Sequence, residues 1–248
     1  MFTISIALVS VCFSAKACLQ LVKNYLLERI AMNINISIGY GASKVLYDNV
    51  EISIEKGEIN NIIGENGTGK STFYKTIIGE IPPLAGEVPS DIQKNIAVIS
   101  DYISLPQELQ VLDVLNFIDN DNIVYMKDNF QNLTNIIFPL SPQKIKTLST
   151  GQKRMLEIFV VLSSKKSILI LDEACNGLDY KNRSFFLKNV KDLVRFNNVT
   201  IFHTSHNLED VIDLGGHVYI LDELSKVFRK YNGSMTIDAL NLFLKKAI

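Results

Sequence analysis

The fold of this chain is decided by residues 64–71, which read Gly-Glu-Asn-Gly-Thr-Gly-Lys-Ser and match the pattern G-x-x-x-x-G-K-[ST]. The apolar run Ile59–Ile63 precedes them and is expected to be a buried strand. Phe73, Ile77 and Ile78 recur at helical spacing, so a helix is predicted directly after the loop. A glycine-rich turn between strand and helix points successive backbone N–H groups at one place, and the helix N-terminus adds about half a positive charge there. The sequence therefore predicts a phosphate-binding loop.

The residue types in this loop fit the binding of a nucleoside triphosphate. Lys70 is expected to bridge the β- and γ-phosphates and to act in catalysis, and the Ser71 hydroxyl is expected to bind Mg²⁺. Glycines let the backbone curl closely around the phosphates. The predicted nucleotide-binding residues of this segment are Gly64, Glu65, Asn66, Gly67, Thr68, Gly69, Lys70, Ser71 and Thr72.

A second apolar run ends in two adjacent carboxylates. Ile168–Leu171 is expected to be a buried strand, and Asp172 and Glu173 follow at its C-terminal end, where ligands of open α/β sheets bind. Asp172 is expected to hold Mg²⁺, and Glu173 is expected to act as the general base that polarises the attacking water. Together with the phosphate loop, these residues predict a P-loop ATPase, a class that also includes kinases, helicases and recombinases.

Composition limits the kind of protein this can be. The chain of 248 residues is long enough for one large α/β domain. Its 25 basic and 26 acidic residues nearly cancel, so nucleic acid is not expected as a partner. Cys12, Cys18 and Cys175 contain no C-x-x-C pair, which argues against a disulfide framework or a structural zinc site and fits a reducing cytoplasm.

Residues 1–31 are expected to be an N-terminal extension ahead of the ATPase domain at 32–248. The apolar stretch Phe2–Phe13 is shorter than the roughly 20 residues of a membrane span, and no basic residue precedes it as in a secretory signal. Met32 is predicted to be the true start of the protein. A peripheral helix lying on a membrane or on a partner is the alternative.

Strand and helix patterns alternate along the rest of the chain. Val50–Glu55 alternates apolar and polar residues, as in a half-exposed strand of an antiparallel subsheet. Ile96–Ser100 and Val199–His203 are short apolar runs typical of buried parallel strands. An α/β fold is therefore predicted, with a mostly parallel core sheet covered on both faces. The helices expected between these strands are Val111–Ile118, Gly151–Leu162 and Ser184–Phe196.

The segment Leu148-Ser-Thr-Gly-Gln152 resembles the Leu-Ser-Gly-Gly-Gln signature of ATP-binding cassette (ABC) proteins. Ser149 is expected to cap the helix that follows. The resemblance implies a P-loop NTPase of ABC type with a small helical subdomain, here at about 102–165. It also implies that Ser149, Gly151 and Gln152 bind nucleotide held by a second ATP-binding subunit, so that ATP is sandwiched in a dimer.

Other elements of this family occur in the expected order. Tyr40 resembles the aromatic residue that stacks on adenine. Asn176–Asp179 resembles the loop that links the two ATP sites, and His206 resembles the catalytic switch histidine that contacts the γ-phosphate. His203 is expected to be structural. The resemblance covers residues 34 to about 221.

Two positions depart from the family pattern. Asp101 stands where a Mg²⁺-binding glutamine is usual; a carboxylate can take a metal position but adds negative charge beside the triphosphate. A shifted loop that uses Gln107 is the alternative. Thr150 replaces the first glycine of the signature and is tolerable if its side chain points away from the phosphate, whereas the more closely packed Gly151 is kept.

The resemblance implies an ATP-binding and ATP-hydrolysing subunit that powers a membrane transporter. Its expected cofactors are ATP and Mg²⁺, and its expected partners are integral membrane permease subunits and a second ABC ATPase. It would be cytoplasmic, held peripherally at the inner face of the cell membrane through the permease. The signature, followed by Lys153 and Arg154, is similar to those of exporters, so export is predicted. A soluble ABC protein without a permease and a poorly hydrolysing regulatory subunit are the alternatives.

Overall fold

The computed structural model of this chain describes residues 30–41, 44–65, 67–100, 105–222 and 227–245. Three of the sequence predictions fall on residues outside these ranges. They concern the N-terminal extension up to residue 29, Asn66 of the phosphate loop, and Asp101.

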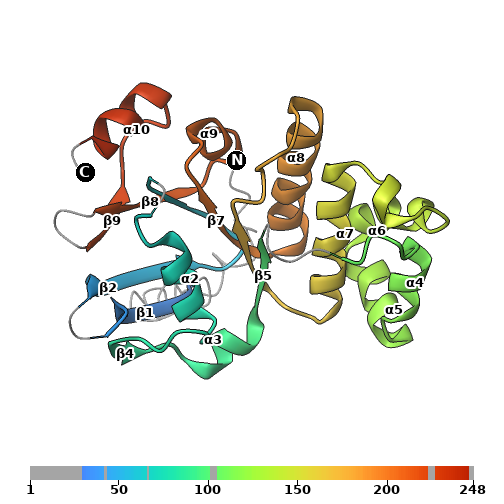
Figure 1. Cartoon of the computed structure of the whole chain (residues 1–248), viewed down its shortest axis with the longest axis horizontal. Helices are drawn as coiled ribbons and strands as arrows, with labels where there is room; N and C mark the ends of the chain where they lie inside the picture. Colours follow the sequence, from blue (N-terminus) through green and yellow to red (C-terminus); the bar gives the residue numbers. More distant parts are fainter. Residues whose placement is uncertain (1–29, 42–43, 66, 101–104, 223–226, 246–248) are drawn as a thin grey trace, which may run out of the picture.

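A six-stranded sheet runs through the centre of the molecule, with the strand order β5-β6-β7-β3-β8-β9 (Figure 1). The first five strands in this order are parallel, and β9 pairs antiparallel with β8. The predicted, mostly parallel core sheet is therefore confirmed. The bounds of its strands are β3 Ile59–Ile63, β5 Ile96–Ser100, β6 Ile168–Asp172, β7 Thr200–Ser205, β8 His217–Asp222 and β9 Val227–Tyr231.

A separate three-stranded antiparallel sheet has the order β2-β1-β4. Its strands are β1 (Ile30–Gly39), β2 (Val45–Glu55) and β4 (Ala85–Glu87). Val50 and Ile52 are buried, as the alternating pattern predicted, and the antiparallel subsheet is confirmed. Strand β1 begins at Ile30, which is opposite Glu55 of β2.

Strand β6 separates two apolar layers. Ile168 and Ile170 pack into a cluster that contains Phe73 of α2 (Lys70–Ile77) and side chains of the antiparallel sheet. Leu169 and Leu171 point to the opposite face, into a cluster with α7 (Thr150–Ser163) and α8 (Tyr180–Asn197). Each such buried side chain contributes about 1.5–3 kcal/mol through the hydrophobic effect. The end of β6, and with it Asp172, is thereby held firmly between the layers.

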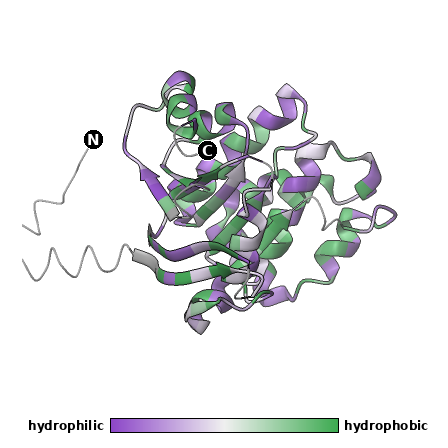
Figure 2. Cartoon of the chain, turned by 60° about the vertical axis from the view of Figure 1, so that its left-hand side comes forward, coloured by the Kyte–Doolittle hydropathy of each residue, from purple (hydrophilic) through white to green (hydrophobic). Residues whose placement is uncertain are grey.

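A group of short helices packs beside α7 at one end of the molecule (Figure 1). The predicted helix Val111–Ile118 is observed as α4 (Val111–Asn116), and two helices that the sequence did not specify follow it. Hydrophobic residues concentrate between the layers, whereas the outer faces are mostly polar (Figure 2). No helix within the described part of the chain is long and apolar enough to cross a membrane. The remaining helices are α3 Ser90–Asn95, α5 Asn120–Asn129, α6 Gln131–Ile137, the 3₁₀ turns Phe138–Leu140 and Ile145–Thr147, α9 Leu208–Leu214 and α10 Ile237–Leu244.

Candidate active site

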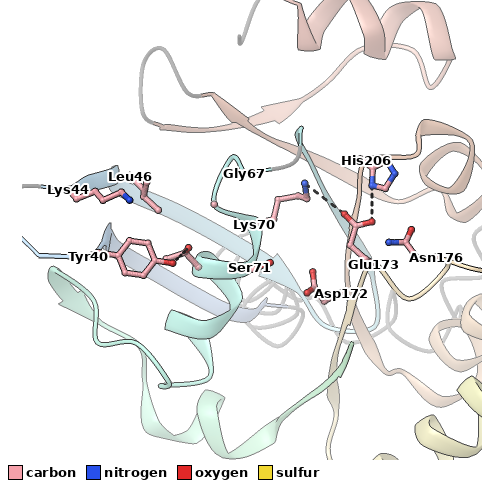
Figure 3. A pocket seen from close by; sticks show the side chains of 12 residues that line it. Tyr40, Lys44, Leu46, Gly67, Lys70, Ser71, Asp172, Glu173, Asn176 and His206 are labelled. Atoms are coloured by element: carbon pink, nitrogen blue, oxygen red, sulfur yellow. Dashed lines mark hydrogen bonds and ion pairs between the residues drawn. The ribbon is translucent and has the colours of Figure 1, made fainter. Parts of the chain in front are cut away.

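One pocket collects most of the predicted site residues at the carboxyl ends of β3 and β6 (Figure 3). Its volume is about 560 Å³, within the range of small-molecule sites. The structure therefore brings the phosphate loop, the adjacent carboxylates and the predicted switch histidine together. The pocket is lined by Tyr40, Lys44, Leu46, Gly67, Gly69, Lys70, Ser71, Thr72, Asp172, Glu173, Asn176 and His206.

The phosphate loop has the backbone conformation that its glycines predict. Gly67 and Gly69 have φ values of 92° and 100°, in the left-handed region that side chains disfavour. At Gly64, an added Cβ would lie 2.8 Å from Oγ1 of the buried Thr68. The hydroxyl of Tyr47 donates to the carbonyl of Thr68 at 2.6 Å and so ties the loop to β2.

Lys70 lies against the loop in this structure. Its ammonium group donates to the carbonyl oxygens of Gly64 and Glu65, each at 2.8 Å, and lies 3.9 Å from Oε1 of Glu173. Burial lowers the pKa of Lys70, and the charges of Glu173 and Asp172 oppose this effect. The Lys70 ammonium group therefore has oxygen partners within the protein itself.

Glu173 presents its carboxylate to the pocket between two basic groups. Oε2 lies 2.8 Å from Nδ1 of His206, and Oε1 faces Lys70 (Figure 3). The backbone of Glu173 is left-handed, with φ of 51°, an uncommon conformation for a residue with a side chain. Its N–H donates to the carbonyl of Thr204 at 3.1 Å, which holds this turn against β7. A carboxylate fixed in this way can accept a proton from a water molecule in the pocket.

Asp172 and Ser71 offer oxygen ligands on the pocket wall. Asp172 is 4% exposed, and Thr204 donates a short hydrogen bond from its Oγ1 to the carboxylate. The hydroxyl of Tyr74 forms hydrogen bonds with the side chains of both Asp172 and Ser71. Burial is the main cause that raises the pKa of Tyr74, and the negative charge of Asp172 raises it further. Tyr74 was not predicted from the sequence, because its position in α2 looks like an ordinary buried helix position. Hard oxygen donors of this kind fit Mg²⁺.

Replacing Tyr74 with Phe is expected to lower the affinity of the ATPase for Mg²⁺ while the fold is kept. Loss of a hydrogen bond that orients a metal ligand typically lowers metal affinity by about 10- to 100-fold. The Mg²⁺ concentration for half-maximal ATPase activity should therefore rise by about that factor at saturating ATP. The half-buried Tyr125 of α5, replaced with Phe, is the matched control and should leave the Mg²⁺ titration unchanged. An unchanged titration in Tyr74→Phe would show that Tyr74 only fills space.

Tyr40 stands at the mouth of the pocket with its ring accessible. Its side chain is 54% exposed, and its hydroxyl shares a hydrogen bond of 2.7 Å with Oγ1 of Thr72. The ammonium of Lys44 lies 5.5 Å from the centre of the ring. Thr72, predicted to bind nucleotide, thus contacts Tyr40 and fixes its direction. Lys44, which was not predicted from the sequence, places its ammonium group over one face of the ring on which a base would stack.

The signature residues lie outside this pocket. Ser149 caps α7, as predicted: its Oγ accepts from the N–H of Gln152 at 3.2 Å, and Oε1 of Gln152 accepts from the N–H of Ser149 at 2.9 Å. Gly151 is buried against Asn182 of α8, whereas Thr150 is exposed. The side chain of Gln107 is exposed, with its amide donating to the carbonyl of Leu105, so Gln107 does not contribute to the pocket.

The sequence relationships of the chain agree with this site. The family model described as "ABC transporter" matches residues 47–176. The chain is 32% identical over 192 residues to the zinc import ATP-binding protein ZnuC of Jannaschia sp. (strain CCS1), covering 74% of this chain and 78% of that protein. It is 25% identical over 219 residues to the molybdate import ATP-binding protein MolC of Haemophilus influenzae, covering 83% and 84%.

Solved structures agree with the fold. The structure of cbiO1 from Clostridium perfringens, described as part of the ABC transporter complex cbiONQ, superposes with a TM-score of 0.68 at 20% identity and covers 89% of this chain and 93% of that one. Because the identity is low, this likeness concerns the fold alone. The pocket, the family match and the zinc import relative together lead to one conclusion: this chain belongs to the ABC transporter family and is an ATP-binding, ATP-hydrolysing subunit of a membrane transporter.

Proposed function

We propose that this subunit pairs with a second ABC ATPase and that the two close around two Mg²⁺-ATP, hydrolyse them and reopen to drive the permease. The separation of the signature from the pocket supports this proposal, because Ser149, Gly151 and Gln152 do not line the pocket of their own subunit and have no role in it. Closure around substrate and reopening after hydrolysis is a common way to convert chemistry into domain movement.

The position of Glu173 carries the catalytic part of the proposal. Its carboxylate, 2.8 Å from His206 Nδ1 and 3.9 Å from Lys70 Nζ, accepts a proton from the attacking water as the water oxygen bonds to the γ-phosphorus. The bond from that phosphorus to the ADP oxygen breaks at the same time, so ADP and inorganic phosphate form. Lys70 and His206 stabilise the charge of the γ-phosphate, and Tyr40 stacks on the base.

Asp172 and Ser71 are proposed to hold Mg²⁺, and Asp101 would add a third oxygen ligand. The burial of Asp172 and its hydrogen bonds from Thr204 and Tyr74 support a preformed metal ligand. Held by these oxygen ligands, Mg²⁺ would neutralise part of the phosphate charge. The glycines of the loop, with Glu65, Asn66 and Thr68, supply backbone groups for the phosphates.

The chain is proposed to lie at the inner face of the cell membrane, attached through the permease, without nucleic acid as a partner. Helices between about 102 and 165 form the subdomain proposed to dock on the permease, and residues 1–31 remain a proposed extension that precedes the domain at 32–248. The near balance of basic and acidic residues supports the absence of a nucleic-acid partner.

Export is the proposed direction of transport, on the basis of the signature and Lys153. Arg154 supports it less, because its guanidinium donates to the carbonyl of Ser100 and pairs with Glu157, which is a structural role. The two relatives above are both named as import proteins. ATP-driven accumulation of the permease's substrate in inside-out vesicles would support export, and accumulation only in right-side-out vesicles would overturn it.

The proposal is tested by isolating the subunit from native membranes in detergent, identifying the proteins that copurify and measuring ATPase activity in the same sample. An integral membrane protein that copurifies with a Glu173-dependent ATPase is expected. Recovery from the soluble fraction alone, with ribosomal or DNA-repair proteins, would instead support a soluble ABC protein. Copurification with a permease but without ATPase activity would indicate a regulatory subunit.

A further inference from the structure

Three buried side chains of metal-ligating type lie close together outside the nucleotide pocket. The ligand atoms of Cys175, His203 and Asp210 all lie within 4.8 Å of one another. The three residues are 8%, 0% and 2% exposed, and they come from the segment after β6, from β7 and from α9. None of them lines the nucleotide pocket, and the hydrolysis mechanism does not use them.

Hydrogen bonds around His203 leave one of its ring nitrogens free for a ligand. The amide nitrogen of Asn61 donates to the carbonyls of Gly215 at 2.7 Å and His217 at 3.1 Å, so the amide oxygen of Asn61 faces His203. Nδ1 of His203 lies 3.0 Å from that oxygen and must therefore carry the proton. Nε2 then holds a lone pair and, buried as it is, has no hydrogen-bond partner among the described residues.

This arrangement is the one that metal-binding histidines use. A ligating imidazole nearly always donates its other N–H to an oxygen that is itself fixed, which sets both the tautomer and the direction of the ring. Burial, aided by the charge of Arg183, lowers the pKa of His203 to about 4, so the ring is neutral near pH 7 as ligation requires.

The charges of the cluster select the kind of ion. Asp210 pairs with Arg183 of α8, and a cysteine thiol is ordinarily neutral near pH 7, so the cluster carries no net charge before an ion binds. A monovalent ion that replaces the thiol proton keeps this neutrality, whereas a divalent ion leaves one uncompensated positive charge in a buried place. Thiolate and imidazole are ligands that suit Cu(I).

The distances fit such an ion. Metal–ligand bonds as long as those in zinc sites, about 2.3 Å to sulfur and about 2.1 Å to nitrogen, place the two ligand atoms no more than ~4.4 Å apart. The observed upper limit of 4.8 Å between the ligand atoms therefore calls for only small side-chain adjustments.

We propose that Cys175 and His203 bind a monovalent soft metal ion, of which Cu(I) is the biological instance, with Asp210 as a third ligand. On binding, the thiol proton of Cys175 leaves to solvent and a metal–sulfur bond forms, without any change in oxidation state. Cys175 lies two residues after Glu173 and directly before Asn176, both of which line the nucleotide pocket. A bound ion fixes this segment and is therefore expected to lower ATP turnover.

The test measures Cu(I) binding directly, under anaerobic conditions and in competition with a chromogenic Cu(I) chelator. The full-length reference protein carries Cys12→Ser and Cys18→Ser, so that only Cys175 remains as a thiol. It is expected to bind one Cu(I) per chain, at least tenfold more tightly than Zn(II). Adding Cys175→Ser should remove this binding, and adding His203→Gln should weaken it by at least tenfold. Circular dichroism verifies that each variant is folded.

X-ray absorption of the loaded protein should show one sulfur ligand, from Cys175, and two nitrogen or oxygen ligands, from His203 and Asp210. Cu(I) should inhibit the ATPase of the reference protein but not of the Cys175→Ser variant. Binding that survives Cys175→Ser would place the ion elsewhere and overturn the proposal. Zn(II) binding as tightly as Cu(I) would overturn the charge argument on which the choice of ion rests. The lack of any Cu(I) binding by the folded reference protein would overturn the proposed site as a whole.

Discussion

Glu173→Gln is expected to lower ATP turnover by about 100- to 10,000-fold, the range that a positioned general base contributes. ATP binding should be nearly unchanged, because the amide keeps the shape of the carboxylate and the loop that holds the phosphates is untouched. The variant should therefore accumulate in the ATP-bound state. Steady-state phosphate release measures the first effect, and equilibrium binding of a fluorescent ATP analogue measures the second.

The matched control is Glu80→Gln, an exposed carboxylate just beyond α2 that should leave both quantities unchanged. Undiminished hydrolysis in Glu173→Gln would refute the assignment of Glu173 as the base. Loss of nucleotide binding instead would mean that Glu173 acts mainly by holding Lys70 and His206 in place.

Lys70→Met is expected to weaken ATP binding by about 10- to 150-fold, the equivalent of one hydrogen bond to a charged group at about 1.5–3 kcal/mol. The methionine keeps the apolar length of the side chain but loses the ammonium group that meets the phosphates. Turnover at saturating ATP should fall as well, because the same group stabilises the transferred phosphoryl charge. Isothermal titration calorimetry with ATP and ADP measures the loss of affinity.

Lys75→Met, in the last turn of the same helix, is the control for Lys70→Met. It removes an equal charge at a position outside the pocket and should leave ATP affinity close to that of the unmodified protein. Equal losses in both variants would point to a general effect of charge on α2. A Lys70→Met protein with full affinity would contradict the proposed role of Lys70.

Much of the fold was predictable because its elements have strong local patterns. Strand β3 matches the predicted Ile59–Ile63, and Ser149 caps α7 as its sequence predicts, since both depend on neighbouring residues in the chain. The position of Lys70 and Glu173 after apolar strands also predicted that they would share a site, because parallel strands deliver their carboxyl ends to one edge.

Contacts between distant segments were not predictable in this way. Tyr74 reaches Asp172 only because α2 packs beside the end of β6, and Lys44 reaches the Tyr40 ring only through the turn between β1 and β2. Likewise, the meeting of Cys175, His203 and Asp210 requires the parallel pairing of β6 with β7 and the return of α9. Hydrophobic periodicity predicts which face of a helix or strand is buried, but it does not predict which side chain of another element contacts that face.

The hydrogen bonds of Lys70 to its own loop affect how the subunit releases its products. Because the ammonium group already has carbonyl partners at 2.8 Å, an incoming phosphate gains only the difference between the two sets of contacts. When ADP leaves, the ammonium group can form hydrogen bonds with the same carbonyl oxygens again, so it does not have to be solvated by water. The contacts of Lys70 with the carbonyls of Gly64 and Glu65 therefore reduce the net free energy that this lysine contributes to holding nucleotide.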